Sequence, residues 1–164
     1  MERIDLVLQK MAAYNGNDVK RINHALKVYA YAQMMSGTFP FSERKILLIA
    51  AILHDIGIHN AEKKYHSSAG KYQEIEGPPV VRALLKDMNL EENSIARVCY
   101  LVGHHHHYMQ VEGEDYQVLI EADLLVNIEE EGLSYQAVQK IGQKHFKTQV
   151  GRKLLHRLFL FKEE

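Results

Sequence analysis

The 164-residue sequence contains no tryptophan, only three prolines and a single cysteine, Cys99. One cysteine excludes an intramolecular disulfide, and we expect a reducing, cytoplasmic setting. Neither sign of charge is in excess, because 20 Lys and Arg residues stand against 21 Asp and Glu residues and the net charge is −1. A near-neutral chain offers no electrostatic basis for coating DNA or RNA, so no nucleic-acid polymer is expected as a partner.

Long apolar segments are also missing. The longest strictly apolar run covers residues 46–53, which is too short to cross a bilayer. Charged residues interrupt the N-terminal segment from Glu2 onward, which argues against a signal peptide. We therefore expect no membrane association. The remaining composition, 46% hydrophobic and 25% charged, is typical of one globular domain with its own core.

Hydrophobic spacing predicts an all-α chain, because apolar residues recur at helical period between glycine, proline and capping residues. The predicted helices cover about residues 2–14, 18–36, 42–56, 78–88, 92–107, 115–131, 135–146 and 148–161. Residues 57–77 are predicted as a loop with one short helix at about 67–74, and Pro78 and Pro79 are predicted to open the next helix.

The predicted architecture is a single-domain helical bundle over residues 1–164. Residues 46–53 are apolar all round, which indicates a buried central helix. The motif-bearing core is expected at about residues 20–130, and the C-terminal helices at about residues 134–161.

Ten histidines are the conspicuous excess in this composition. One of them forms the pair His54-Asp55 at the end of the predicted buried helix, just before Gly57. A carboxylate there needs a cation or hydrogen bonds, and imidazole and carboxylate groups are good ligands for a divalent metal. Adjacent helical residues point about 100° apart, so both can reach one ion only where the helix ends. The alternative is a helix-capping pair without a metal.

Further candidates lie on other predicted helices. His24 is in the middle of the helix at 18–36, and Asp123 sits in an apolar run where a carboxylate needs a partner. Four consecutive histidines occupy residues 104–107 at a predicted helix end. The alternatives are a half-buried structural histidine for His24 and a helix cap or arginine partner for Asp123.

Taken in order, these residues resemble the HD-domain superfamily of metal-dependent phosphohydrolases. The resemblance is carried by NHALKV at 23–28, AAILHDIG at 50–57 and IEAD at 120–123. It implies that His24, His54, Asp55 and Asp123 bind one divalent ion of iron, manganese, cobalt, nickel, magnesium or zinc. It further implies hydrolysis of a small phosphate ester by metal-activated water, with a nucleotide as the leading candidate substrate.

Some families within this superfamily hold a second ion through an extra ligand and paired histidines. His104 is the first choice for that pair and His105 the second. Glu76 is preferred as the extra ligand or a catalytic base, because it precedes the predicted helix at 78–88, and His66 is the alternative. Lys27 lies three residues after His24 on the same helix face and is predicted to contact the phosphate. Its alternative is a solvated surface lysine.

Two other functions remain open at this stage. A binding or regulatory module could keep the metal ligands and bind a nucleotide while hydrolysis is weak or lost. A di-iron oxygenase of the HD type would need the two-metal set, so a single ion would exclude it. Glu76 and Lys27 directed toward the metal would favour the hydrolase.

Overall fold

The computed structural model of the protein describes residues 3–162. Within this range the chain is helical and has no β-strand, so the all-α prediction is confirmed. The elements are α1 (Ile4–Asn15), α2 (Val19–Met35), α3 (Phe41–Leu53), α4 (Ile58–Tyr65), α5 (Gly70–Leu85), α6 (Glu92–His104), α7 (Glu114–Glu131), α8 (Tyr135–His145), α9 (Gln149–Leu155) and the π-helical turn η1 (His156–Leu160).

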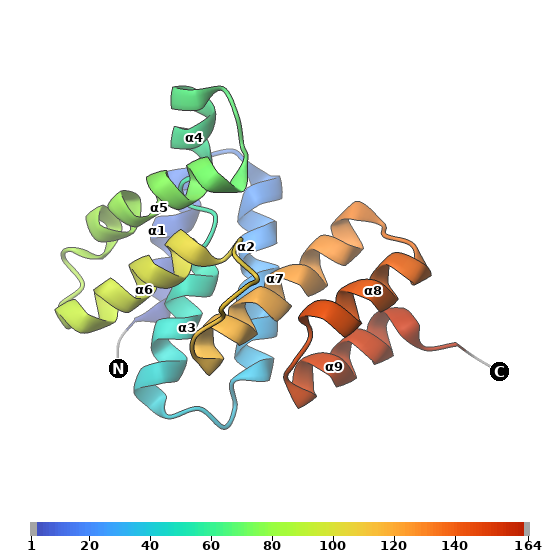
Figure 1. Cartoon of the computed structure of the whole chain (residues 1–164). Coiled ribbons are helices and arrows are strands. Elements are labelled where there is room, and N and C mark those ends of the chain that lie inside the picture. Colours follow the sequence, from blue (N-terminus) through green and yellow to red (C-terminus); the bar gives the residue numbers. More distant parts are fainter. Residues whose placement is uncertain (1–2, 163–164) are drawn as a thin grey trace.

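Helix α3 lies at the centre of a single helical domain, with α1, α2, α6 and α7 packed around it (Figure 1). Every residue from Leu47 to Leu53 is buried, as expected for a segment that is apolar on all sides. Helix α7 is nearly as deeply buried, and its interior residues include the acidic Glu121 and Asp123. No helix in the range 3–162 is both long and apolar enough to cross a membrane.

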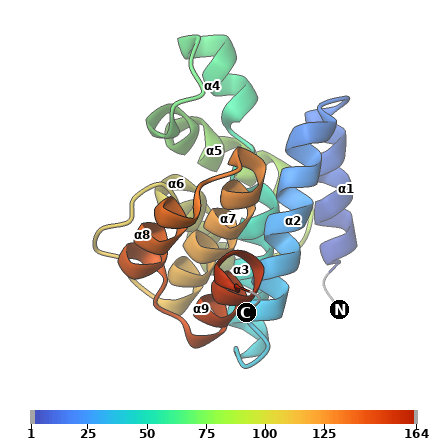
Figure 2. The same cartoon turned by 90° about the vertical axis from the view of Figure 1, so that its right-hand side faces the viewer.

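Helices α8 and α9 form a hairpin that packs against α7 (Figure 1). Ser134 and Thr148 begin these two helices, each accepting a hydrogen bond from a backbone N–H in the first turn. Helix α4 stands out from the rest of the bundle in both views (Figures 1 and 2).

The segment 57–77 differs from the prediction. Residues 58–65 form α4. This helix was not predicted, because only Ile58 and Ala61 of this short helix are buried. Helix α5 then begins at Gly70 and runs through Pro78 and Pro79 instead of beginning at them. A proline removes one helical hydrogen bond, but packing against α6 supports the helix here, and the Cys99 thiol donates to the Pro78 carbonyl at 3.7 Å.

Gly57 explains how α5 approaches the end of α3. A Cβ atom at Gly57 would lie 2.5 Å from the backbone nitrogen of Gly77 and 2.6 Å from the carbonyl oxygen of Gln73. Only glycine permits two backbones to come this close. The contact brings one side of α5 against the His-Asp turn, which matters for the site described next.

Candidate metal site

Four predicted ligands lie together at one end of the buried helices. His24 comes from α2, His54 and Asp55 from the turn after α3, and Asp123 from α7. The Nε2 atoms of His24 and His54 are 3.1 Å apart. Oδ1 of Asp123 lies 3.1 Å from the first and 3.3 Å from the second, and Oδ2 of Asp55 lies 3.3 Å from each. The end of α3 at Leu53 lets two consecutive side chains face the same point.

The hydrogen bonds behind the histidines fix which ring nitrogen faces the cluster. Nδ1 of His54 donates to the Ala51 carbonyl at 2.8 Å, and Nδ1 of His24 donates to the Glu130 carboxylate at 3.2 Å. In the neutral rings both Nε2 atoms therefore carry lone pairs, and they face each other and two carboxylates. Such a set of electron-pair donors repels itself unless a cation lies among them, so these residues fit a divalent metal ion.

The ionisation behaviour of the cluster leads to the same conclusion. Burial alone would lower the pKa of His24 and His54, but the carboxylates of Asp123 and Asp55 outweigh it, and the pKa of both histidines is raised. Burial would raise the pKa of the two carboxyl groups, but the facing histidines hold both pKa values well below the usual range. Positive charge is thus required at this point, as protons or as a metal ion.

A second group that could hold a metal shares two of these residues. It consists of His54, Asp55 and His105, with His105 Nε2 3.3 Å from Oδ1 of Asp55. Nδ1 of His105 donates to the Val102 carbonyl at 2.8 Å, so Nε2 again carries the lone pair. This nitrogen is buried and has no hydrogen-bond partner among the described residues. An orphaned buried acceptor of this kind is expected where a ligand is missing.

Of the histidine run, the structure therefore brings His105 to the site rather than the first choice, His104. Helix α6 ends at His104, whose ring stacks on Tyr100 with centroids 4.1 Å apart. The turn that follows aims His105 inward. Tyr116 braces this turn, because its buried hydroxyl lies within hydrogen-bond distance of the carbonyl oxygens of His104 and His107 and shares its one proton between them.

The two candidates for the extra ligand are not brought to the cluster. Neither Glu76 nor His66 belongs to a metal-capable group within residues 3–162. The Glu76 carboxylate pairs with Lys64 at 3.0 Å, and His66 ends α4 in a left-handed conformation. Because α5 begins at Gly70, Glu76 is an interior helix residue, and its prediction as a residue preceding the helix is wrong.

Glu74 is the carboxylate that reaches the histidine run. Its Oε1 lies 3.1 Å from Nε2 of His107, and its Oε2 is buried without a hydrogen-bond partner among the described residues. Burial raises the pKa of Glu74 although the nearby histidines oppose the shift. Glu74 and Glu76 are two positions apart on one helix and so face opposite sides. The sequence would have indicated Glu74 only if α5 had been predicted to begin at Gly70.

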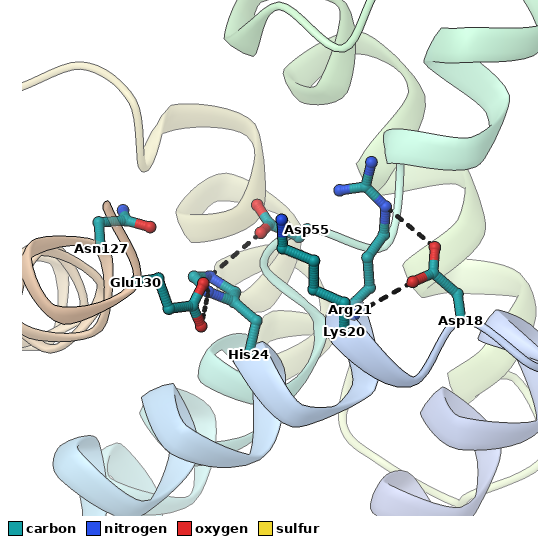
Figure 3. A pocket seen from close by; sticks show the side chains of 7 residues that line it. All are labelled: Asp18, Lys20, Arg21, His24, Asp55, Asn127 and Glu130. Carbon is teal, nitrogen blue, oxygen red and sulfur yellow. Dashed lines mark hydrogen bonds and ion pairs between the residues drawn. The ribbon is translucent and has the colours of Figure 1, made fainter. Parts of the chain in front are cut away.

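The mouth of the cluster is a cavity of about 250 Å³ (Figure 3). It is lined by His24 and Asp55 together with Asp18, Lys20, Arg21, Asn127 and Glu130. Lys27, the predicted phosphate contact, is not among them and instead pairs with Glu129 at 3.3 Å and with Glu130 at 3.6 Å. The lysine at the cavity is Lys20, one helical turn before His24 on the same face of α2.

Residues 21–141 match the family model of the HD domain, and the chain therefore belongs to the HD domain family. The structure is similar to a crystal structure of a predicted HD superfamily hydrolase from an uncultured Thermotogales bacterium. The two share 20% sequence identity and a TM-score of 0.65, with 97% of this chain and 86% of the other covered. At that identity the similarity establishes the fold. The sequence matches none of the curated proteins with which it was compared.

Proposed function

We propose that the protein is a metal-dependent phosphohydrolase that cleaves a small phosphate ester, with nucleotides as the first class to assay. The observation that carries the proposal is the convergence of His24, His54, Asp55 and Asp123, in which each histidine Nε2 lies 3.1–3.3 Å from the other and from both carboxylates. Membership of the HD domain family supports it.

In this proposal the four side chains hold one divalent ion, and His105 with Asp55 and His54 can hold a second. A bound divalent ion lowers the pKa of a coordinated water and polarises a phosphoryl group. The chain supplies the orientation: the Ala51 and Val102 carbonyls fix the rings of His54 and His105 with Nε2 inward. Lys20 and Arg21 at the cavity supply positive charge for the phosphate.

Glu74 is a candidate proton carrier near the second group. Its side chain is only 8% exposed, and burial raises its pKa. A buried carboxyl group of raised pKa is suited to general acid–base catalysis. Its partner His107 is exposed, so protons can exchange with solvent along this pair.

The second group is also compatible with an alternative function. A di-iron oxygenase of the HD type requires two adjacent ions, and the position of His105 beside Asp55 is compatible with that requirement. Phosphate release separates the two functions. Release with one or two bound ions supports the hydrolase, whereas two redox-active iron ions without phosphate release support the oxygenase.

The test of the proposal is phosphate release from a panel of nucleotides and simple phosphate esters. The protein is assayed with manganese, cobalt, magnesium, iron, nickel or zinc, beside the variant Asp55→Ala. We expect release with at least one ion and a loss of about 100-fold or more in the variant, because the Asp55 carboxylate lies 3.3 Å from Nε2 of His24, His54 and His105.

A matched control is Asp5→Ala, which removes an exposed carboxylate paired with Arg3 and should leave activity unchanged. Absence of release with every ion, in protein that is folded and loaded with metal, would reject the hydrolase. A metal-containing binding or regulatory module would then be the better description.

A further inference from the structure

The cavity beside the metal-capable cluster has an unusual lining. All seven of its lining residues are polar or charged, and the only ring among them is the imidazole of His24, a candidate ligand (Figure 3). Small-molecule pockets are ordinarily lined mainly by apolar and aromatic side chains, with a few polar groups for orientation. No aliphatic side chain and no Phe, Tyr or Trp ring lines this cavity, so it is suited to a ligand that is mostly polar.

A nucleobase finds no Phe, Tyr or Trp ring to stack on in this cavity. Proteins that bind bases place aromatic rings, arginine guanidinium planes or apolar side chains against the base faces. The two groups of this kind that line the cavity are already engaged, the His24 imidazole by Glu130 and the Arg21 guanidinium by Asp18 and Glu62. Tyr108, which follows the histidine run, does not line the cavity, and its ring packs on His145 with centroids 4.6 Å apart. A base brought here would lose water from its flat faces and gain few apolar contacts in return.

Charged groups at the mouth suit a phosphate and its carrier. Lys20 forms no ion pair with any residue in the range 3–162 and extends from α2 along the side of the cavity that holds Asp55 (Figure 3). Arg21 is shared by Asp18 and Glu62, at 3.2 and 2.7 Å, and is thereby held at the rim. Asn127 and Asp18 add donors and acceptors of the kind that bind hydroxyl groups.

We infer that this site recognises a phosphate monoester on a hydroxylated carrier, as in a sugar phosphate, through Lys20, and that a base contributes nothing to recognition. The inference rests on the proposed hydrolase function and narrows its substrate class. The cavity volume of about 250 Å³ is in keeping with a small carrier.

Ribose 5-phosphate and adenosine 5′-monophosphate form the matched pair for the test, since they differ by the adenine. We expect kcat/KM for ribose 5-phosphate to be higher than that for the nucleotide or to lie within about threefold of it. A preference of more than about tenfold for the nucleotide would overturn the inference, because such a preference requires contacts with the base.

Binding of the same two compounds to the metal-loaded protein, measured by calorimetry, decides the matter without turnover. Equal dissociation constants support the inference, and tighter binding of the nucleotide by about tenfold or more contradicts it. If neither compound nor any other phosphate ester is cleaved, the hydrolase proposal fails separately, while the binding comparison still judges the recognition.

Lys20→Gln tests the contact itself. We expect this variant to bind both compounds more weakly, each by about tenfold in the dissociation constant, because one charged hydrogen bond is lost. Lys140→Gln, an exposed lysine on α8, is the matched control and should bind both as the unaltered protein does. An unchanged affinity in Lys20→Gln would remove Lys20 from the recognition site.

Discussion

Both carboxylate oxygens of Glu130 lie 3.2 Å from Nδ1 of His24. Glu130 follows Asp123 by seven residues, which is two turns of α7 on the same face. One helix thus provides a candidate ligand and the carboxylate that orients a second candidate ligand on α2. The other two inward-facing histidines, His54 and His105, are oriented by backbone carbonyls, so His24 alone depends on a side chain that mutation can remove.

Replacing Glu130 should therefore weaken metal binding. Removal of a carboxylate that orients a ligating histidine typically costs about 10–100-fold in metal affinity. We expect this loss for Glu130→Ala and a smaller one for Glu130→Gln, which keeps an acceptor for Nδ1. Competition with a chelating metal indicator measures both. Glu131→Ala changes the exposed neighbour and is the control; equal affinity in all three variants would refute the role.

Tyr116→Phe should loosen the histidine turn. The variant leaves the His104 and His107 carbonyls without the hydroxyl donor, at a cost of about 1–3 kcal/mol in the free energy of unfolding. Because this turn aims His105, binding at the second group should weaken more than binding at the first.

Urea unfolding and metal titration measure the two effects of Tyr116→Phe. Tyr135→Phe retains the ring over which Lys162 lies and serves as the control, with little change expected. If Tyr116→Phe were as stable as the unaltered protein and bound the same number of metal ions, the Tyr116 hydroxyl would not stabilise the turn.

Gly151→Ala should destabilise the attachment of the C-terminal hairpin. Glu121 is fully buried in α7, and its carboxylate accepts hydrogen bonds from the backbone N–H groups of Lys147 and Thr148, from the Thr148 hydroxyl and from Gln117. A Cβ atom at Gly151 would lie 1.9 Å from this carboxylate, so something must shift. We expect a loss of about 1–3 kcal/mol from overpacking.

Gly37→Ala is the control for that substitution, because no atom lies within 4 Å of a Cβ placed there. Thermal or urea unfolding compares the two variants. If Gly151→Ala were no less stable than Gly37→Ala, the close approach of α9 to Glu121 would not hold in solution.

The metal-free protein should lose stability in mild acid through His106. Burial lowers the pKa of His106 to about 4, helped by the charge of His105 and opposed by Asp55 and Asp123. The unfolded chain binds this proton near pH 6.5, so stability is present above that pH and is lost as the pH falls toward 4. Between pH 7 and pH 5 the loss from this group is about 2 kcal/mol.

Urea unfolding with a chelator present, at pH 7 and pH 5, tests this. His106→Asn should lose less stability between the two pH values than the unaltered protein, by about 2 kcal/mol. His156→Asn, at an exposed histidine, should behave like the unaltered protein. An equal acid sensitivity in His106→Asn would assign the loss to other groups.

The helical architecture could be predicted from the sequence because most helices bury one stripe or all of their surface. The limits of α2, α3, α7 and α8 fall within a few residues of those expected. The sequence did not predict α4 or the start of α5, because composition and proline positions were misleading there. The helix α4 is mostly polar, and the prolines of α5 indicate a helix start unless packing against another helix supports them.

For the site, sequence order and motif context identified His24, His54, Asp55 and Asp123, which the fold brings together. The sequence could not rank His104 against His105, because the choice depends on the residue at which α6 ends and the turn begins. It could not select Glu74 over Glu76, because packing decides which face of α5 meets the histidines.

By itself, then, the sequence determined the helical class and the candidate metal-ligand set, since these depend on residue type and on order along the chain. The tertiary structure decided the surroundings: Glu130 behind His24, Lys20 rather than Lys27 at the cavity, and a cavity lined by polar and charged side chains. The physical reason is that a side chain's partners are set by helix phase and by the distance between helices. Both are properties of packing, which no local pattern encodes.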